Sequence, residues 1–331
     1  MQKRTDNWEN STKAELQKRI ACPQEEFHWI FEEADKLRQE LYGDNVHIRG
    51  IIEFSNYCKR QCAYCGLNST NTNAIRYRME PEDIIHTAEA GWQAGYRTVV
   101  LQSGEDPFFT KELLGEIVKS IKKKTDLSIT LSCGELPRED YAYLRECGAD
   151  RYLLKHETAD AEIYARLHPC GTLANRLNCL RDLKAIGYET GSGFMVGLPG
   201  QTPGVLAADI LQLAAIPCDM AGIGPFVPHP GTALGNLPPG STELVKRCVA
   251  LTRLVVGKIH LPATTALGVL SPNATQEIFS CGANVIMRKL TPSNLRKYYE
   301  IYPAEFRDMG DIQSARTELE AFIKGMGRIP L

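Results

Sequence analysis

The chain has 331 residues, a formal net charge of −2 and 43% hydrophobic residues. This length suits two average domains or one large α/β barrel, because such barrels routinely exceed ~250 residues as a single unit. The charge offers no basic surface for nucleic acid, and no apolar run reaches the ~18 residues that a membrane-spanning helix needs. The polar N-terminus, Met1–Asn10, lacks a signal-peptide core, so the eleven cysteines are expected as free thiols or metal ligands in a reducing cytoplasm.

The predicted elements begin with a helical region, where apolar residues recur at amphipathic spacing between Phe27 and Tyr42. Short apolar runs then alternate with helical stretches. The predicted strands are Ile48–Phe54, Thr98–Gln102, Ser128–Leu131, Arg151–Leu154, Gly191–Val196, Met220–Pro225, Leu261–Ala266 and Asn284–Met287. The predicted helices are 81–95, 111–124, 138–147, 159–187 in two pieces, 203–216, 241–257 and 273–280.

This alternation is typical of βαβ units on a parallel sheet that is covered on both faces. About eight such units predict a (β/α)8 barrel of the α/β class. A doubly wound open sheet is the alternative, but no G-x-G-x-x-G follows the first predicted strand. We expect an N-terminal helical extension over 1–47 and one barrel over 48–292. A C-terminal helical segment over 293–331, clearest at Ser314–Lys324, would pack on the barrel.

Three cysteines, Cys58, Cys62 and Cys65, follow the first predicted strand in a C-x-x-x-C-x-x-C spacing. A cubane iron–sulfur cluster is usually held by about four thiolates, so three leave one iron open to a small molecule. A zinc knuckle would need a fourth ligand, and only His47, on the preceding strand, lies near in sequence. Inert buried thiols are a further alternative, which the charged residues between the cysteines disfavour.

Polar residues also stand at the ends of the next three predicted strands, where barrel enzymes build their sites. These segments are Gln102–Pro107, Thr130–Glu135 and Lys155–Thr158. Taken alone, the segment Gln102–Pro107 predicts an ordinary turn. Taken alone, Glu157 is expected to be a solvated carboxylate. Arg176 is nominally a surface residue, although its fork suits a carboxylate ligand. His156 is expected to be structural.

The cysteine spacing, with Tyr64 before the last cysteine, resembles the radical S-adenosylmethionine (SAM) superfamily, in which SAM chelates the open iron. Longer blocks resemble one family within it, the [FeFe]-hydrogenase maturases of the HydE type. The blocks are IIEFSNYCKRQCAYCGL, RYRMEPEDI, LQSGEDP, RYLLKHETA, NRLNCL, GYETGSGFMVGLPGQT, GIGPFVPHPGTAL, PATTALG and CGANVIMRKLTPS.

The resemblance implies a role for each matching residue. Cys58, Cys62 and Cys65 would bind the [4Fe–4S] cluster. The residues expected around SAM are Tyr64, Ser103, Gly104, Glu105, Thr130, Glu157 and Arg176. The residues expected to line a substrate cavity are Gln102, Lys155, Thr264, Thr265, Met287, Tyr299 and Tyr302. Thr264 and Thr265 would lie on the seventh strand, and the two tyrosines, three apart, would share a face of a helix.

The implied activity is reductive cleavage of SAM to a 5′-deoxyadenosyl radical during assembly of the hydrogenase's dinuclear iron subcluster. The implied substrate is an organometallic iron complex with carbonyl, cyanide and cysteine ligands. The implied partners are a tyrosine-cleaving radical SAM maturase, a GTPase scaffold and a reductant such as ferredoxin or flavodoxin.

Two departures from the family pattern matter. Lys155 stands where the family often has Arg, which replaces a bidentate clamp by a point charge. No cysteine follows Cys281, so we expect a single cluster. A 3-methylornithine synthase and a cluster-carrying scaffold without catalysis remain alternatives. Biotin synthase is disfavoured, because its Tyr-Asn-x-Asn block and its second set of cysteines are not found.

Overall fold

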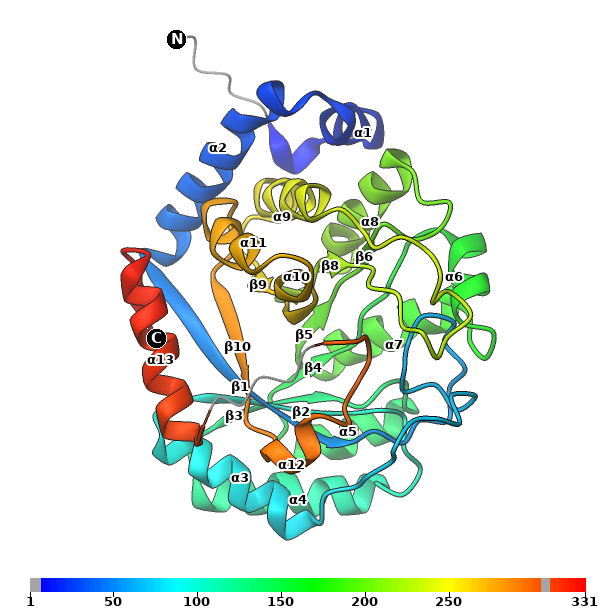
Figure 1. Ribbon diagram of the computed structural model, residues 1–331, viewed down its shortest axis with the longest axis vertical. Helices are drawn as coiled ribbons and strands as arrows, with labels where there is room; N and C mark the ends of the chain where they lie inside the picture. The colour runs from blue at the N-terminus through cyan, green and yellow to red at the C-terminus, as the bar shows by residue number, and fades with distance from the viewer. Residues whose placement is uncertain (1–6, 305–309) are drawn as a thin grey trace.

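The computed structural model describes residues 7–304 and 310–331. In these residues, parallel strands curve into a nearly closed barrel with helices around it (Figure 1). The strand order is β7-β5-β4-β3-β2-β1-β10-β9. A parallel bridge between Met220 and His260 brings the two ends of this sheet together. The predicted α/β barrel is therefore confirmed.

The barrel strands cover most of the predicted ones. They are β1 (Asn45–Ser55), β2 (Thr98–Ser103), β3 (Ser128–Ser132), β4 (Arg151–Leu153), β5 (Glu189–Ser192), β7 (Met220–Ala221), β9 (Pro262–Ala263) and β10 (Val285–Lys289). Neighbouring strands pair in parallel, as βαβ crossovers require.

The fifth and sixth predicted strands are each interrupted, which the sequence did not predict. Their second halves, β6 (Met195–Val196) and β8 (Gly224–Pro225), form a separate parallel pair. The break lies at Gly193, which has φ +149°, and a Cβ there would lie 2.1 Å from the carbonyl oxygen of Gly222. The two backbones approach too closely for a side chain at this position.

The seventh predicted strand, Leu261–Ala266, extends too far towards the C-terminus. Pairing with β10 covers only Pro262 and Ala263. The chain then turns into helix α10 (Thr265–Leu270), which buries Ala266 and Leu267. Helical spacing lets these two apolar side chains reach the core, whereas a strand would alternate them between faces.

The remaining helices follow the predicted ones closely. They are α1 (Lys13–Ala21), α2 (Gln24–Tyr42), α3 (Pro81–Gln93), α4 (Lys111–Lys124), α5 (Arg138–Glu146), α6 (Ala161–Leu167), α7 (Leu173–Ile186), α8 (Pro203–Ala215), α9 (Thr242–Val256), α11 (Pro272–Glu277), α12 (Ser293–Arg296) and α13 (Ile312–Gly325). Side-chain oxygens cap several of them, including those of Thr12, Asp160, Thr172, Thr202 and Ser241. Among helices in residues 7–304 and 310–331, none is both long and apolar enough to cross a membrane.

The chain ends also meet the barrel. Helices α1 and α2 pack on α8 and α9 (Figure 1). The C-terminal segment contains, besides its helices, the short strand β11 (Ile329–Pro330), which pairs with β1 at Asn45 and Val46. The segment is therefore tied to the sheet by backbone hydrogen bonds as well as by helix packing.

The barrel interior contains a buried arginine. On β1, Ile52 and Phe54 belong to the hydrophobic core, whereas Arg49 points the other way. Its Nη1 donates to Met220 Sδ on β7 at 3.1 Å, although several strands separate β1 from β7 in the sheet. Both side chains therefore point into the barrel, and the interior suits a polar ligand.

We expect His260, where the barrel closes, to make folding stability depend on pH. Its ring centroid lies 4.7 Å from that of His47. Burial, followed by the positive charges of Arg49 and of further cations, lowers the pKa of His260 to about 3. The unfolded chain binds this proton below ~6.5 and the folded chain does not, so stability falls as pH decreases from about 6.5 towards 3. The slope from one such group is ~1.4 kcal/mol per pH unit.

The measurement is chemical denaturation of cluster-free protein at about pH 6.5 and about pH 5. The variant His260→Gln should lose less free energy of unfolding between these two values than the parent does. Equal losses would show that His260 does not contribute to this pH dependence.

Candidate functional site

Cys58, Cys62 and Cys65 lie, half-buried, in the loop that follows β1. Backbone hydrogen bonds hold this cysteine loop on two sides. On one side, Lys59 N donates to the carbonyl of Glu105 at 3.0 Å, in the loop after β2. On the other, Ala63 N donates to the carbonyl of Leu167 at 2.9 Å, at the end of α6. The sequence-predicted cysteines thus stand at the carboxyl-end rim of the barrel.

Two glycines let the cysteine loop pack closely on its surroundings. A Cβ at Gly104 would lie 2.2 Å from the carbonyl oxygen of Tyr57 and 2.7 Å from Cys58 Cβ. A Cβ at Gly66 would lie 2.2 Å from the carbonyl oxygen of Glu300. Glu105 N, next to Gly104, donates to Cys58 Sγ at 3.4 Å. Hydrogen bonds to sulfur are one means by which proteins tune iron–sulfur clusters.

Burial and neighbouring negative charges raise the pKa of all three thiols. Burial is the main cause at Cys58 and Cys62, and the negative charges of Cys65 and Cys58 add to the rise at Cys62. Burial, with the negative charges of Cys58 and Glu157, raises the pKa of Cys65 to about 12. Thiols of this kind lose their protons when a cationic metal centre binds them. The donor set therefore fits a cluster that neutralises three neighbouring thiolates.

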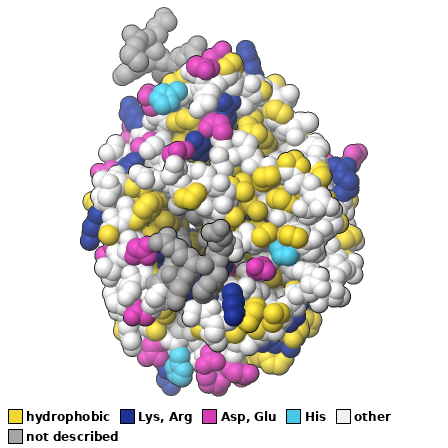
Figure 2. Space-filling view, in the orientation of Figure 1, with side chains coloured by type: hydrophobic (Ala, Val, Ile, Leu, Met, Phe, Trp, Pro, Cys, Tyr) yellow, Lys and Arg dark blue, Asp and Glu magenta, His cyan; other side chains and the backbone are white. Residues whose placement is uncertain are grey.

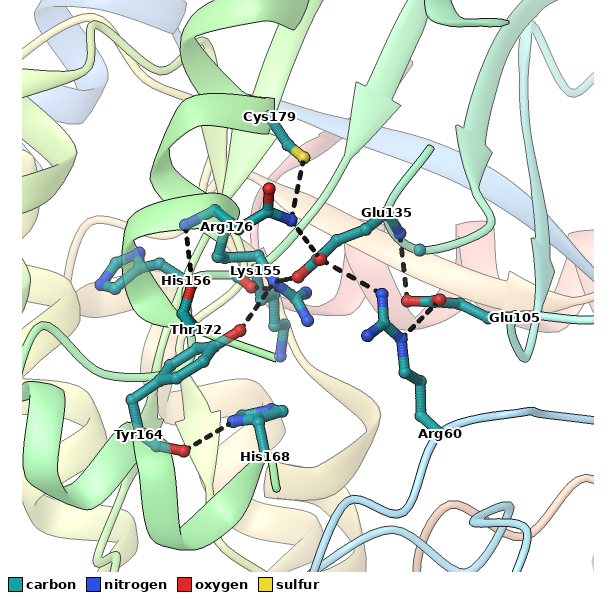
Figure 3. A network of polar contacts seen from close by, with 12 residues as sticks. Arg60, Glu105, Glu135, Lys155, His156, Tyr164, His168, Thr172, Arg176 and Cys179 are labelled. Carbon is teal, nitrogen blue, oxygen red and sulfur yellow. Dashed lines mark hydrogen bonds and ion pairs between the residues drawn. The ribbon is translucent and has the colours of Figure 1, made fainter. Parts of the chain in front are cut away.

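A network of charged side chains lies behind the cysteine loop (Figure 3). Arg60 Nε donates to Glu105 Oε2 at 2.6 Å, and Arg60 Nη2 lies 3.2 Å from Glu135 Oε2. Arg176 Nε lies 2.7 Å from Glu135 Oε1. These four residues join the cysteine loop, the loops after β2 and β3, and helix α7. Glu135 was noted in the sequence only as part of a strand end, because nothing in the sequence pairs it with arginines so far away.

Arg176 is not the surface residue that its sequence context indicates. It is 9% exposed. Its Nη1 donates to the carbonyl of Lys155 and its Nε to the hydroxyl of Tyr164, both at 3.1 Å. Burial acts to lower the pKa of Arg176, but the neighbouring Tyr164 and Glu135 outweigh it and raise that pKa. Arg176 is therefore a fixed cation beside the end of β4.

Two buried oxygens, one on β3 and one just after β4, have neither a hydrogen-bond partner nor an ion-pair partner in the described residues. They are Glu157 Oε2 and Thr130 Oγ1. Glu157 follows β4 and has φ +65°. It is the only non-glycine residue with a positive φ in the described part of the chain. Thr130 lies on β3, which pairs with β4. Leaving such oxygens unpaired costs ~1–3 kcal/mol each, so the two atoms mark positions where donors of a bound ligand fit.

His156, between Lys155 and Glu157, is fully buried. Its Nδ1 lies 3.0 Å from Ser192 Oγ, and its Nε2 lies 3.7 Å from Asp209 Oδ1 on α8. These contacts anchor the residue directly before Glu157, whose backbone is left-handed. His156 thus acts on the site through the backbone rather than by facing it.

Tyr64, in the cysteine loop, is tied to α6 by a histidine that the sequence did not single out. The hydroxyl of Tyr64 lies 3.1 Å from His168 Nε2. The ring of His168 stacks on that of Tyr164, with centroids 4.2 Å apart. Burial and the charge of Arg176 lower the pKa of His168 to about 3, so the ring is neutral. Figure 3 shows His168 and Tyr164 next to Arg176.

The remaining residues expected around SAM lie in the loop after β2. Ser103 ends β2 and lies near the Cys133 thiol, where it opposes the rise in pKa that burial gives this thiol. Gly104 and Glu105 follow it and contact the cysteine loop as described. The structure thus places these residues beside the cysteines, with Glu105 engaged by Arg60.

Two of the residues expected around a substrate are tyrosines that the sequence wrongly placed on a helix. Helix α12 ends at Arg296, so Tyr299 and Tyr302 lie beyond it and share no helix face. Burial raises the pKa of both phenols, and Gln102 near Tyr299 and Thr265 near Tyr302 oppose that rise. Each tyrosine therefore lies near another residue of the expected set.

The other members of that set are placed differently. The prediction that Thr264 and Thr265 lie on a strand is wrong. Thr265 is exposed and begins α10, and Thr264 directly precedes this helix. Met287 on β10 is in register with Arg49. The Lys155 side chain reaches towards β7, since a Cβ on Gly222 would lie 3.0 Å from Lys155 Cε and 3.7 Å from its Nζ.

Alanine at Gly104 is expected to disturb the cysteine loop, because the added Cβ would overlap the backbone of Tyr57. We expect Gly104→Ala to lower the free energy of unfolding by ~1–3 kcal/mol and to reduce the iron retained after reconstitution. Gly325→Ala is the matched control, because a Cβ there meets nothing within 4 Å and the residue has no positive φ. Urea denaturation and iron analysis make the comparison, and equal iron retention in both variants would contradict the packing argument.

Comparisons with known proteins agree with this geometry. Residues 52–210 match the family model of the radical SAM superfamily. The chain is 50% identical over 276 residues to the [FeFe] hydrogenase maturase subunit HydE of Thermotoga maritima, covering 83% of this chain and 79% of that protein. It is 29% identical to the 3-methylornithine synthase of Methanosarcina acetivorans, over 93% of this chain and 86% of that one. The crystal structure of methylornithine synthase (PylB) superposes with a TM-score of 0.86 at 26% identity, covering 98% of this chain and 96% of the other.

Proposed function

The chain belongs to the HydE family of radical SAM maturases of [FeFe]-hydrogenase, and on this premise we propose that Cys58, Cys62 and Cys65 hold its [4Fe–4S] cluster. We propose one cluster per chain. No cysteine follows Cys281.

The observation that carries the proposal is the pair of unpartnered buried oxygens just after β4 and on β3, Glu157 Oε2 and Thr130 Oγ1. SAM has an ammonium group and ribose hydroxyls that donate to such acceptors. Arg176 supplies a fixed cation close by, which suits the SAM carboxylate. Tyr64, Ser103, Gly104 and Glu105 complete the proposed cofactor site.

When bound, the cluster supplies the electron that breaks the carbon–sulfur bond of SAM, which yields methionine and a 5′-deoxyadenosyl radical. The residues of the chain hold SAM in a fixed orientation and exclude water from the reacting carbon. Glu157 is fixed for this task, because its backbone is anchored through His156 to Ser192 and Asp209.

For the substrate, we propose an organometallic iron complex that carries carbonyl, cyanide and cysteine ligands. The interior cation Arg49 and the side chain of Lys155 suit an anionic complex. Tyr299 lies near Gln102 and Tyr302 lies near Thr265, and these four residues with Thr264 and Met287 form the proposed lining. The proposed partners are a tyrosine-cleaving radical SAM maturase, a GTPase scaffold and a ferredoxin or flavodoxin, in a reducing cytoplasm.

We propose that 1–47 and 293–331 are extensions of the barrel over 48–292 rather than domains of their own. The packing of α1 and α2 on α8 and α9, and the pairing of β11 with β1, support this division.

The test is anaerobic incubation of the reconstituted protein with SAM and dithionite, followed by chromatography for 5′-deoxyadenosine. We expect its formation, and consumption of the iron complex when that is supplied. An intact cluster without 5′-deoxyadenosine would favour a scaffold and contradict the proposal. Conversion of lysine to 3-methylornithine would favour the mutase instead.

A further inference from the structure

Three large hydrophobic side chains are exposed near the cysteine loop. Tyr57, Ile75 and Phe108 are 36%, 62% and 50% exposed. Tyr57 directly precedes Cys58. Asn56, the residue before Tyr57, donates from its Nδ2 to the carbonyl of Ile75 at 2.7 Å, which places Ile75 beside the start of the same loop. Exposed apolar side chains that gather in one place often mark an interaction site.

An arginine holds this group together. The Cζ of Arg78 lies 3.9 Å from the ring centroid of Tyr57 and 4.8 Å from that of Phe108. Its Nε and Nη2 donate to the two carboxylate oxygens of Asp106 at 2.7 and 2.9 Å. The guanidinium is therefore fixed in orientation between the two rings. The Arg78 patch is defined here as Tyr57, Lys59, Ile75, Arg78 and Phe108.

The exposed charges of the Arg78 patch are basic. The side chain of Arg78 is 35% exposed, whereas the side chains of the acidic residues Glu105 and Asp106 are 8% and 0% exposed. The side chain of Lys59 is 56% exposed, and its Nζ lies 3.8 Å from Glu105 Oε2. Arg60 approaches the same oxygen to 2.6 Å, so Lys59 is the weaker partner and remains available to another carboxylate.

We propose that the Arg78 patch is the docking surface for an acidic one-electron carrier protein, which reduces the cluster proposed at Cys58, Cys62 and Cys65. This inference rests on the proposed function. One electron leaves the reduced carrier and enters the oxidised cluster, and no bond forms or breaks. An apolar centre with basic side chains at its edge is complementary to an acidic partner and accelerates encounter. Such electron-transfer interfaces are small, which suits a patch of this size.

The position of the patch supports this role. Tyr57 and Cys58 are adjacent in the chain, so one peptide unit separates an exposed ring from a proposed ligand. Gly104, whose missing side chain allows contact with both residues, lies four positions before Phe108. The loops after β1 and β2 thus present the patch on the outside and the cysteines behind it.

Two variants at one position test the charge preference. Phe108→Glu and Phe108→Lys remove the same ring and add opposite charges. Titration calorimetry of the reconstituted protein with an oxidised acidic ferredoxin at low salt should show binding weakened at least ~10-fold by Phe108→Glu and less than ~3-fold by Phe108→Lys. The matched control is Lys324→Glu, on α13, whose side chain is 65% exposed. It should bind like the parent.

Cross-linking locates the interface without turnover. A carbodiimide that joins lysines to carboxylates should link Lys59 to the ferredoxin, as read by mass spectrometry of the peptides. Links that avoid Lys59, together with equal binding by both Phe108 variants, would overturn the docking proposal. Failure of the parent protein to bind the ferredoxin would overturn it too.

Activity separates this proposal from the proposed function. Formation of 5′-deoxyadenosine driven by reduced ferredoxin should fall at least ~10-fold in Phe108→Glu, whereas formation driven by dithionite should equal that of the parent. The dithionite arm also shows that the variant is folded. If the parent protein forms no 5′-deoxyadenosine with dithionite, the proposed function is wrong. If Phe108→Glu responds to ferredoxin as the parent does, only the docking surface fails.

Discussion

Replacing Cys62 by alanine is expected to abolish formation of 5′-deoxyadenosine, with a loss of at least ~1000-fold, because two thiolates do not retain a cubane that needs three. The iron content of the reconstituted protein should fall from about four per chain to near zero. The same result is expected for Cys58→Ala and Cys65→Ala. Iron and sulfide analysis and the absorbance of the cluster measure the loss.

Cys170→Ala is the control for this experiment. Cys170 is exposed and close to the cysteine loop, since its Sγ lies 3.7 Å from Gln61 Oε1. Alanine there should leave iron and activity unchanged, because one iron must stay open for SAM. Loss of the cluster in Cys170→Ala would show that four cysteines hold it. Clearly more than about four irons per parent chain would contradict a single cluster.

Replacing Arg176 by alanine is expected to cost about 3 kcal/mol of folding stability and most of the affinity for SAM. The change leaves Glu135 buried without the cation 2.7 Å away. Breaking a buried ion pair on one side costs ~3–5 kcal/mol, and the lower end applies because Arg60 and Asn175 still contact Glu135. Urea denaturation of the cluster-free protein gives the free energy of unfolding, and equilibrium dialysis of the reconstituted protein gives the SAM affinity.

The matched control for Arg176 is Arg138→Ala. Arg138 pairs with Asp182, but the two side chains are 54% and 36% exposed. Water screens such a pair, so its loss should cost no more than ~1 kcal/mol. Equal destabilisation by the two variants would contradict the assignment of Arg176 and Glu135 as a buried pair. Unchanged SAM affinity in Arg176→Ala would remove Arg176 from the proposed SAM site.

Local sequence patterns predicted most of the fold because helices and long strands are determined over short stretches. The helix at Lys111–Lys124 was predicted at its observed bounds, since Thr110 caps it and its apolar residues repeat at helical spacing. The prediction failed at Gly193, where a close approach to Gly222 decides the backbone, and at Thr265, where burial of Ala266 and Leu267 favours a helix. No local pattern indicates that the carbonyl of Gly222 excludes a side chain from residue 193.

The cysteine loop shows the same difference between what local sequence determines and what only the tertiary structure decides. The sequence by itself determined the three thiols, their spacing and the ends of the strands beside them, because covalent order sets which residues can meet at the barrel rim. Only the tertiary structure decided that Arg60, Glu105, Glu135 and Arg176 form one network, and that Glu157 and Thr130 keep unpartnered buried oxygens. Ion pairing and desolvation depend on distances between residues far apart in the chain, and packing of the whole barrel sets those distances.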